Sequence, residues 1–528
     1  MEIDLTNGTF AANNNDVQPV SAVGTDYFEV VKSAGTVESD KITGYEPIYV
    51  KWAKRISDNG GGIEATIRNI KFTNMGIKDR GATDASWGWT IDGCWFDGSS
   101  SDFFRAVSGR TDSGIRVSSS NVTIKNNKFS IYNFAIQSRS FGAYNNITIR
   151  DNKMESGTGQ YTSFINMQGL NIGGDSSTTW TISDEGGGTF RYTWSGGTDP
   201  FVNSTWEEYD CWFLGEGFSS YNRGIFEITN SLATGGVGVE YYEVVNPGGT
   251  AESDKAIGAG WMENIGRSTD LISQPGGSRN WNVSNNYVYR IVWASGTNPW
   301  SNEPTIRFIG TDSTFNNNRF NVAVGGDNNS EAKHVWAIGG GITIANNQFK
   351  GGGKTVTIAD KGRCIITGNR FTDFARGIWH ETRGNSVLLN RGHSIISNNI
   401  FINTEDTQDG EGIYIYDPVN NLDQNLIITG NSFYDMNRAI YTTAKNNLVI
   451  SNNIANNMAD VAYRLQACDN MVLQGNIATN SNQGFYLNNC DLLTMHGNIS
   501  TANNTGADSI TGITNTKPAT VGDQNILQ

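Results

Sequence analysis

One short pattern repeats along most of this chain, and it limits what the chain can fold into. It reads apolar, any, apolar, any, Asn or Gly, Asn, any, apolar. The copies are NVTIKNNKF (121–129), ITIRDNKM (147–154), WNVSNNYV (281–288), GITIANNQF (341–349), CIITGNRF (364–371), SIISNNIF (394–401), LIITGNSF (426–433), LVISNNIA (448–455), MVLQGNIA (471–478) and LLTMHGNIS (492–500), with degenerate copies at ATIRNIKF (65–72) and WTIDGCWF (89–96). A fixed internal pattern of this kind indicates a repeat architecture.

The spacing of the copies identifies the repeating unit. The second polar residue of each later copy is an asparagine, at Asn347, Asn369, Asn399, Asn431, Asn453, Asn476 and Asn498. The successive steps are 22, 30, 32, 22, 23 and 22 residues, a base period of 22 with loops added at two turns. Two or three short strands with their turns fill such a period, and no segment has a helical period. The sequence therefore predicts an all-β chain whose repeating unit is one coil of a parallel β-helix, about 22 residues long.

The recurring asparagine has a physical reason in such a coil. Stacked coils place equivalent residues about 4.8 Å apart, so the asparagine amides can hydrogen-bond to one another in a ladder. Asparagine also tolerates the left-handed backbone region that a sharp turn requires. Cys468 and Cys490 are 22 residues apart and occupy the same coil position, so we expect them to stack in the core.

On these motifs, residues 61–172 and 279–515 resemble the pectate-lyase-like superfamily of right-handed parallel β-helices. That superfamily includes polysaccharide lyases, glycoside hydrolases and bacteriophage tailspikes. The resemblance implies a right-handed β-helix, and because tailspikes are homotrimers it implies a homotrimer on the virion or outside the cell. Function has to be argued from the site, since the motif is a folding motif.

The repeat is interrupted, which divides the chain. We expect an N-terminal capping segment (1–60), a first part of the β-helix (61–172), an inserted β-rich subdomain or set of long loops (173–278), the main part of the β-helix (279–515) and a C-terminal tail (516–528). EYYEVVNPGGTAESDK (240–255) matches DYFEVVKSAGTVESDK (26–41) at 10 of 16 positions. This duplicated module is interpreted either as a repeated hairpin on the flank of the helix or as a repeated sugar-binding element.

Each later coil carries another strand, about nine residues past the asparagine. Side chains alternate along a strand, so placing Ile378, Ile413 and the equivalent residues inside sends their neighbours outward. The outward column is Trp379, Tyr414, Tyr441, Arg464 and Tyr486, with a second column of Glu381, Tyr416, Thr443, Gln466 and Asn488. Arg307 and Trp336 are candidates to extend the first column.

An exposed aromatic stripe indicates a ligand groove or a covered interface. Aromatic rings suit the apolar faces of sugars, and Arg, Gln and Asn supply hydrogen bonds to hydroxyls. We therefore expect a polysaccharide to bind to Trp379, Tyr414, Tyr416, Tyr441, Arg464 and Tyr486. The alternative is an aromatic ladder covered by a neighbouring subunit or by the inserted loops.

Composition excludes other partners. The net charge of -14 argues against nucleic acid and against an anionic membrane surface. Five widely spaced cysteines without a CxxC motif argue against a metal or redox site, so we expect no cofactor. No apolar run is long enough to span a membrane, and MEIDLTNGTF lacks the features of a signal peptide, so we expect no membrane insertion and release by lysis or removal of a leader.

Glycoside hydrolysis requires two carboxylates that flank the scissile bond. Glu381 lies in the second outward column between Trp379 and Arg383, and Asp417 ends the equivalent strand one coil later. Asp409 and Glu411 belong to the inserted loop before that strand. We therefore predict Glu381 and Asp417, with Glu411, as catalytic carboxylates. His380 is expected to point inward.

Elimination is the alternative chemistry. The run ADKGRCIITGNRF…HETRGN (359–385) resembles the alginate lyase and chondroitinase B-like family. The resemblance implies Lys361 as the base, Arg383 as the catalytic acid, and Ca²⁺ as a cofactor. Three functions remain open at this point: a tailspike-like glycoside hydrolase, a polysaccharide lyase, and a non-catalytic receptor-binding or adhesin fibre.

Overall fold

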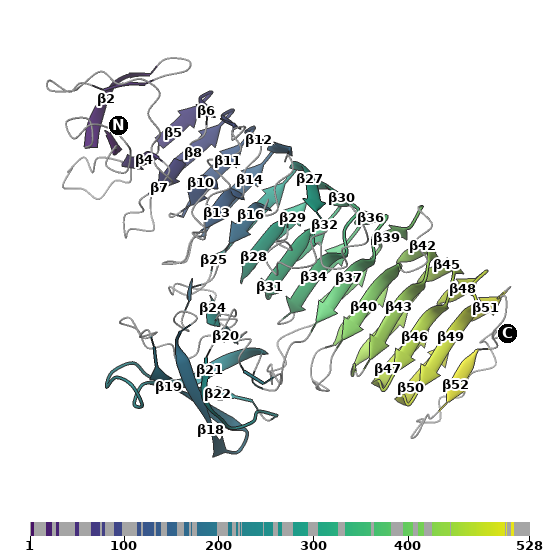
Figure 1. Cartoon of the computed structure of the whole chain (residues 1–528). Coiled ribbons are helices and arrows are strands. Elements are labelled where there is room, and N and C mark those ends of the chain that lie inside the picture. Colours follow the sequence, from purple (N-terminus) through teal and green to yellow (C-terminus); the bar gives the residue numbers. More distant parts are fainter. Residues whose placement is uncertain are drawn as a thin grey trace. The chain divides into compact units, whose positions relative to one another are not determined.

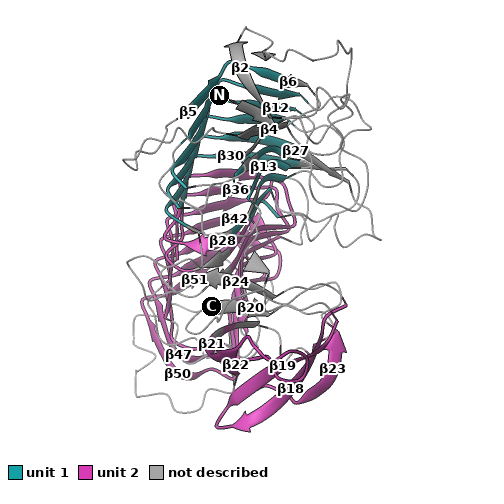
Figure 2. Cartoon of the chain, turned by 90° about the vertical axis from the view of Figure 1, so that its left-hand side faces the viewer, with its two compact units in different colours: residues 1–168, 279–308, 314–335 teal, residues 169–278, 309–313, 336–528 magenta. Residues whose placement is uncertain are grey.

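The computed structural model divides the chain into two compact units (Figure 2). Unit 1 comprises residues 1–168, 279–308 and 314–335, and unit 2 comprises residues 169–278, 309–313 and 336–528. The described residues are 2–4, 17–23, 28–30, 48–51, 65–73, 77–79, 89–97, 113–117, 120–130, 134–138, 145–155, 163–167, 170–171, 177–197, 210–213, 218–219, 222, 224–246, 248–256, 262–266, 278–293, 305–325, 333–360, 364–381, 394–404, 410–416, 425–443, 445–501, 503 and 508–511. Every regular element in these ranges is a β-strand apart from one isolated 3₁₀ residue, and none of them contains a helix capable of crossing a membrane.

Each coil consists of three strands, which we assign to sheets I, II and III. A sheet II strand leads into the asparagine turn, a sheet III strand follows the turn, and a sheet I strand completes the coil. Equivalent strands of successive coils pair in parallel, as Figure 1 shows. The chain therefore folds as the parallel β-helix that its 22-residue period predicts.

Unit 1 contains the earlier coils. Its sheet II strands are β5 (Ala65–Arg68), β8 (Trp89–Asp92), β11 (Val122–Lys125), β14 (Ile147–Arg150), β26 (Trp281–Ser284) and β29 (Thr314–Asn316). Its sheet III strands are β6 (Lys71–Thr73), β9 (Trp95–Asp97), β12 (Lys128–Ser130), β15 (Lys153–Glu155), β27 (Tyr287–Trp293) and β30 (Arg319–Gly325). Its sheet I strands are β4 (Ile48–Lys51), β7 (Ile77–Asp79), β10 (Ser113–Val117), β13 (Phe134–Ser138) and β16 (Ser163–Met167).

A few strands of the chain lie outside this pattern. The strands β1 (Glu2–Asp4), β2 (Val17–Val23) and β3 (Phe28–Val30) pair antiparallel, β1 with both β2 and β4 and β3 with β2. The strands β25 (Ser278–Arg279), β28 (Ile306–Thr311) and β31 (Val335–Gly339) fall on boundaries between the two units.

Unit 2 contains the later coils. Its sheet II strands are β32 (Thr343–Ala345), β35 (Ile365–Thr367), β38 (Ser394–Ser397), β41 (Leu426–Thr429), β44 (Leu448–Ser451), β47 (Asp469–Gln474) and β50 (Asp491–His496). Its sheet III strands are β33 (Gln348–Lys350), β36 (Arg370–Thr372), β39 (Ile400–Ile402), β42 (Ser432–Met436), β45 (Ile454–Met458), β48 (Ile477–Thr479) and β51 (Ile499–Thr501). Its sheet I strands are β34 (Lys354–Asp360), β37 (Arg376–Glu381), β40 (Glu411–Tyr416), β43 (Arg438–Thr443), β46 (Val461–Gln466), β49 (Gln483–Asn488) and β52 (Ser509–Thr511).

Buried asparagines connect the coils within each unit. In unit 2 the Asn431 side chain donates from Nδ2 to Asn453 Oδ1 at 2.9 Å, and its own Oδ1 accepts from Asn399 Nδ2 at 2.9 Å and from the Asn399 backbone N–H at 3.0 Å. The same bonds run from Asn347 to Asn498 in unit 2 and from Asn127 to Asn318 in unit 1. The predicted asparagine ladder is confirmed.

The structure separates two roles that the sequence assigned to one asparagine. The left-handed residue is the one before the ladder asparagine, with φ of 55° at Asn398 and 68° at Gly430. A Cβ at Gly430 would lie 2.7 Å from Asn398 Oδ1, so glycine is required beside an asparagine of the preceding coil. The ladder asparagine itself bonds to the next coil.

Apolar stacks fill the core beside the ladder. Phe371, Phe401 and Phe433 stack at ring-centroid distances of 4.6 and 4.8 Å. The Phe433 ring lies so close to β40 that a Cβ at Gly412 would approach it to 2.5 Å. Cys468 and Cys490 are fully buried on adjacent coils, as predicted, and the pKa of the Cys468 thiol is raised by its hydrogen bond with Cys490 and by burial.

Residues 170–266 form an eight-stranded sheet of unit 2 in which all recorded pairings are antiparallel. Its order is β17 (Leu170–Asn171), β24 (Met262–Gly266), β20 (Asp210–Phe213), β21 (Gly224–Leu232), β22 (Tyr241–Val245), β19 (Thr189–Gly196), β18 (Thr179–Gly186) and β23 (Glu252–Ala256). Trp180, Tyr192, Phe218 and Tyr242 belong to its own apolar core. The predicted boundaries of the insertion, like those of the other segments, stay predictions.

The hairpin interpretation of the duplicated module is wrong for its second copy. The module supplies β22 and β23, but β22 pairs with β19 and β21 whereas β23 pairs with β18. The two strands are separated by the β18–β19 hairpin because both edges of that hairpin are available for pairing. In the first copy, only residues 28–30 are described, as β3.

We predict that Asn431→Ala lowers the free energy of unfolding by about 4 kcal/mol, because it removes the buried acceptor of the Asn399 backbone N–H and of the Asn399 side-chain amide, and a buried donor to Asn453 Oδ1. Urea denaturation measures the change. The matched control is Asn282→Ala, an exposed asparagine on β26, for which we expect less than about 0.5 kcal/mol. Equal effects in the two variants would contradict a stabilising ladder.

Candidate functional site

The predicted outward column lies on sheet I of unit 2. Parallel pairing aligns Trp379 with Tyr414, Tyr414 with Tyr441, Tyr441 with Arg464, and Arg464 with Tyr486. All five side chains are partly exposed, whereas their inward neighbours are fully buried, these being Ile378, Ile413, Ile440, Tyr463 and Phe485. We call Trp379, Tyr414, Tyr441, Arg464 and Tyr486 the sheet I stripe.

The rings of the stripe contact one another directly. Trp379 stacks on Tyr414 with 4.5 Å between ring centroids, and Tyr441 meets Tyr414 edge to face at 4.9 Å. Arg464 continues the column, with its guanidinium carbon 5.2 Å from the Tyr441 ring and 5.3 Å from the Tyr486 ring. These contacts hold each side chain in place against its neighbours on the adjacent coils.

Charged residues at the start of the sheet I strands form a second row beside the rings. Lys354 and Arg376 lie over the Trp379 ring at 4.3 and 4.4 Å, and Arg438 lies over the Tyr441 ring at 5.0 Å. Glu411 joins the two arginines, accepting from Arg376 Nε at 2.8 Å and from Arg438 Nη1 at 3.0 Å.

Arg438 also binds Asp460, with Nε donating to Oδ2 at 2.7 Å. Burial lowers the pKa of Arg438, but the hydrogen bond and charge of Asp460, together with Glu411, outweigh burial and raise it. Arg438 is therefore a fixed cation beneath the stripe.

Sequence reasoning missed this charged row. Lys354, Arg376 and Arg438 open their strands two residues before a buried position, and Glu411 stands at the same place in β40. The sequence signal was the charged first residue of RGIW, EGIY and RAIY, which are Arg376, Glu411 and Arg438. Equivalent positions on adjacent coils lie next to one another, so these charges predict ion pairs between coils.

The structure corrects the placement of Glu411. The sequence assigned it to an inserted loop, but it is the first residue of β40 and only 7% exposed. The strand begins earlier than expected because the Glu411 backbone N–H donates to the Ala375 carbonyl of the preceding coil.

The other predicted catalytic residues are described only in part. Glu381 ends β37 and pairs in register with Tyr416 of β40, and the description of both residues stops at the backbone. Asp417, Arg383, Lys361 and Asp409 lie outside the described residues. The pairing of Glu381 with Asp417 stays a prediction.

The remaining expectations near the stripe have clear outcomes. His380 is 3% exposed and points inward, as expected. Arg307 is 1% exposed, so the expectation that it extends an exposed column is wrong. It is buried because its strand neighbours on either side, Ile306 and Phe308, are also in the core, so no exposed alternation exists there. Trp336 on β31 is partly exposed.

Three polar atoms beside or within the stripe have no hydrogen-bond partner in the described part of the chain. They are Trp379 Nε1, Thr443 Oγ1 and Arg464 Nε. Buried polar groups are nearly always satisfied by protein or water, so these atoms have hydrogen-bonding capacity that the fold leaves unused. The ranges described hold no group of three or more His, Cys, Asp or Glu side chains arranged to bind a metal ion.

One family model matches part of the chain. Residues 380–520 match the model described as a right handed beta helix region. The fold of this chain is a right-handed parallel β-helix. No curated protein matches its sequence.

Several solved structures are similar to the chain at low sequence identity. One is the tailspike of Escherichia coli bacteriophage HK620 in complex with a hexasaccharide, with 11% identity, 89% of this chain and 74% of that chain covered, and a TM-score of 0.42. Another is the tailspike of Acinetobacter baumannii bacteriophage AP22 in complex with a capsular saccharide, with 11% identity, 75% and 61% covered, and a TM-score of 0.29. A third is a surface adhesin of Streptococcus pneumoniae, with 11% identity, 80% and 85% covered, and a TM-score of 0.34.

Proposed function

We propose that this right-handed β-helix protein binds a polysaccharide along the sheet I stripe and hydrolyses it. The observation that carries the proposal is the register of the stripe, which presents an aromatic ring or a guanidinium on each of five adjacent coils. Adjacent coils are about 4.8 Å apart, so a polymer of short repeat that runs along the helix axis meets a similar group at each coil.

The chemistry of the stripe suits a carbohydrate. Ring edges and the arginine stem offer apolar contact, while the tyrosine hydroxyls and the terminal guanidinium nitrogens of the partly exposed Arg464 offer hydrogen bonds. The charged row of Arg376, Glu411 and Arg438 keeps the rings fixed before a ligand arrives, which reduces the entropy lost on binding.

Glu381 and Asp417 are the proposed catalytic carboxylates. Glu381 pairs with Tyr416 on the next coil, and Asp417 follows Tyr416 directly. Retaining and inverting hydrolases hold their two carboxylates about 5–9.5 Å apart, and the proposal requires Glu381 and Asp417 to meet that distance.

Glu411 has a different role in this proposal. Its carboxylate is buried and bound by two arginines, so it positions Arg376 and Arg438 rather than exchanging a proton with a substrate. Elimination with Lys361 and Arg383, with Ca²⁺ as its cofactor, is the competing chemistry, and a non-catalytic fibre is the competing class.

We propose a homotrimer that acts outside the cell or on a virion. Unit 2 presents outward aliphatic side chains on its other two sheets, with Ile395, Ile427, Val449 and Val472 aligned on sheet II and Ile454, Ile477 and Ile499 aligned on sheet III. Ile400 and Ile454 are 39% and 40% exposed. Contiguous exposed aliphatic area favours a subunit interface. A subunit contact on these sheets leaves the sheet I stripe for the glycan.

Binding is tested with Tyr441→Ala and Tyr486→Ala. We expect each variant to bind the recognised polysaccharide about tenfold more weakly than the native protein in a glycan panel. Tyr434→Ala is the control, since Tyr434 is partly exposed on sheet III, and its affinity should stay within about twofold. Unchanged affinity in both stripe variants would rule out the stripe as the binding surface.

Catalysis is tested with Glu381→Gln and Asp417→Asn. Both variants should lose release of new reducing ends by at least about a hundredfold while retaining glycan binding, because amides cannot transfer protons or act as nucleophiles. Products with the ultraviolet absorbance of an unsaturated end would indicate elimination instead. Absence of any product from native protein and a full glycan panel would favour the fibre.

Oligomeric state is tested with the double variant Ile400→Lys and Ile454→Lys. Light scattering should give three chain masses for the native protein and one for the variant, because buried lysines oppose association. The control Val237→Lys changes an exposed residue of the insertion and should remain trimeric. A native mass of one chain would exclude the trimer.

A further inference from the structure

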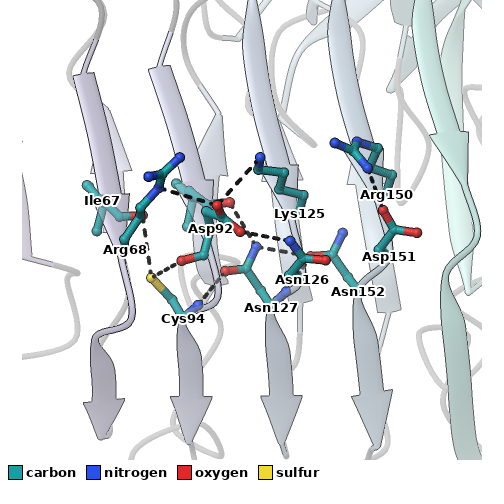
Figure 3. A network of polar contacts seen from close by, with 11 residues as sticks. Ile67, Arg68, Asp92, Cys94, Lys125, Asn126, Asn127, Arg150, Asp151 and Asn152 are labelled. Carbon is teal, nitrogen blue, oxygen red and sulfur yellow. Dashed lines mark hydrogen bonds and ion pairs between the residues drawn. The ribbon is translucent and has the colours of Figure 1, made fainter.

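Basic residues flank the asparagine turn in four of the six described coils of unit 1. They lie at the end of sheet II strands or at the start of sheet III strands, in the runs RNIK, KNNK, RDNK and NNNR. Figure 3 shows Arg68, Asp92, Lys125 and Arg150 beside this turn. We call the following residues the basic band: Arg68, Lys71, Lys125, Lys128, Arg150, Lys153 and Arg319.

On sheet III the band alternates with aromatic rings. The register aligns Lys71, Trp95, Lys128, Lys153, Tyr287 and Arg319 on successive coils. Lys71 and Lys128 lie over the two sides of the Trp95 ring, with their Nζ atoms 4.0 and 4.9 Å from its centroid. Lys153 and Arg319 approach the Tyr287 ring at 5.8 Å each.

Neighbouring acids neutralise part of the band. Asp92 lies 3.3 Å from Arg68 and 3.5 Å from Lys125, and its pKa is lowered by a hydrogen bond from Asn126 and by these cations, against the opposing effect of burial. The other ion pairs are Lys71–Asp97 at 3.2 Å, Arg150–Asp151 at 2.7 Å and Lys153–Glu155 at 2.6 Å. Seven cations therefore face four carboxylates, a net of three positive charges in a chain whose net charge is -14.

Lys128 and Arg319 supply the unneutralised charge. Both are exposed, and neither forms an ion pair with a carboxylate among the described residues. Lys128 also sits directly beside Lys153 on the next coil. Glu155 neutralises Lys153 at 2.6 Å, whereas Lys128 lies over the Trp95 ring, so an anion at this place would bind chiefly to Lys128.

The coils of unit 2 show that the turn does not require these cations. At the two positions that flank its asparagine turn, unit 2 has Ala345 and Gln348, Thr367 and Arg370, Ser397 and Ile400, Thr429 and Ser432, Ser451 and Ile454, Gln474 and Ile477, and His496 and Ile499. Arg370 is the single arginine or lysine in that set. The same backbone turn forms with both sets, so the concentration of charge in unit 1 calls for a reason other than folding.

We propose that the basic band binds a carboxylated polysaccharide, as a second glycan surface beyond the sheet I stripe. The band spans six coils, about 24 Å, so its net charge of three corresponds to about one charge per 8 Å. Double-stranded nucleic acid carries one charge per about 1.7 Å and would meet the strong repulsion of the remaining acidic chain. A glycan with one carboxylate per few sugars matches this sparse charge, and the rings between the cations contact its apolar faces.

The test uses hyaluronan, which carries one carboxylate for every two sugars, and dextran as an uncharged polymer. The triple variant Lys128→Gln, Lys153→Gln and Arg319→Gln adopts the residue type that unit 2 has at Gln348. We expect native protein to bind hyaluronan in preference to dextran, with affinity that falls as salt rises, and the triple variant to bind about tenfold more weakly. Lys128→Arg with Lys153→Arg should retain native affinity.

The control variant removes the same charge elsewhere. Lys255, Lys350 and Arg370 are exposed residues of unit 2, and changing all three to glutamine should alter hyaluronan affinity by less than about twofold. Equal losses in the two triple variants, or no preference for hyaluronan over dextran, would overturn the proposal. Tighter binding of double-stranded DNA than of hyaluronan would overturn it in favour of a nucleic-acid surface. Tyr441→Ala changes the sheet I stripe and leaves the basic band intact. The glycan affinity of this variant therefore tests the stripe alone, and the hyaluronan affinity of the triple variant tests the band alone.

Discussion

The asparagine ladder is the constraint on which the rest of the structure depends. Each buried amide accepts from the coil before it and donates to the coil after it, and the same bonds form whether successive ladder residues are 22, 23, 30 or 32 residues apart. The ladder thereby fixes which residues of adjacent coils are neighbours. Outward side chains that are 22 to 35 residues apart in the stripe, and up to 134 residues apart in the band, become continuous rows, and both proposed glycan surfaces are such rows.

Much of the fold followed from the sequence because the same local rule is applied in every coil. The alternation at Ile378 and Trp379 sufficed to predict which side chains would be buried and which exposed. The pattern did not show that two adjacent residues of the turn have different roles. Gly430 adopts the left-handed backbone conformation, and Asn431 forms the hydrogen bonds to the adjacent coils. Two adjacent residues of one motif look alike in sequence, and only the coil-to-coil contacts distinguish them.

The site was predicted less completely. The rings of the stripe were predicted because strand alternation places them outward. Glu411 was predicted to lie in a loop and to act as a catalytic carboxylate, whereas its carboxylate is bound by two arginines. That ion network is formed by residues from three coils, and its existence depends on the exact start of β40. The basic band escaped prediction for a related reason, since net charge over the whole chain conceals a local excess of cations.

The stripe and the band illustrate how a repetitive scaffold acquires function. A parallel β-helix repeats one backbone, so a surface changes character along the chain only when the outward residues change. In unit 2 sheet I carries the mainly aromatic stripe and sheets II and III carry rows that include outward aliphatic residues, whereas several turns of unit 1 carry basic residues. Each row offers a different chemistry on the same frame.

A crystal structure with a bound oligosaccharide of the recognised glycan tests the central claim most directly. The account predicts sugar rings along Trp379, Tyr414, Tyr441, Arg464 and Tyr486, with the glycosidic bond next to Glu381. Sugar bound elsewhere, with the same five side chains covered by a second copy of the chain, would contradict it.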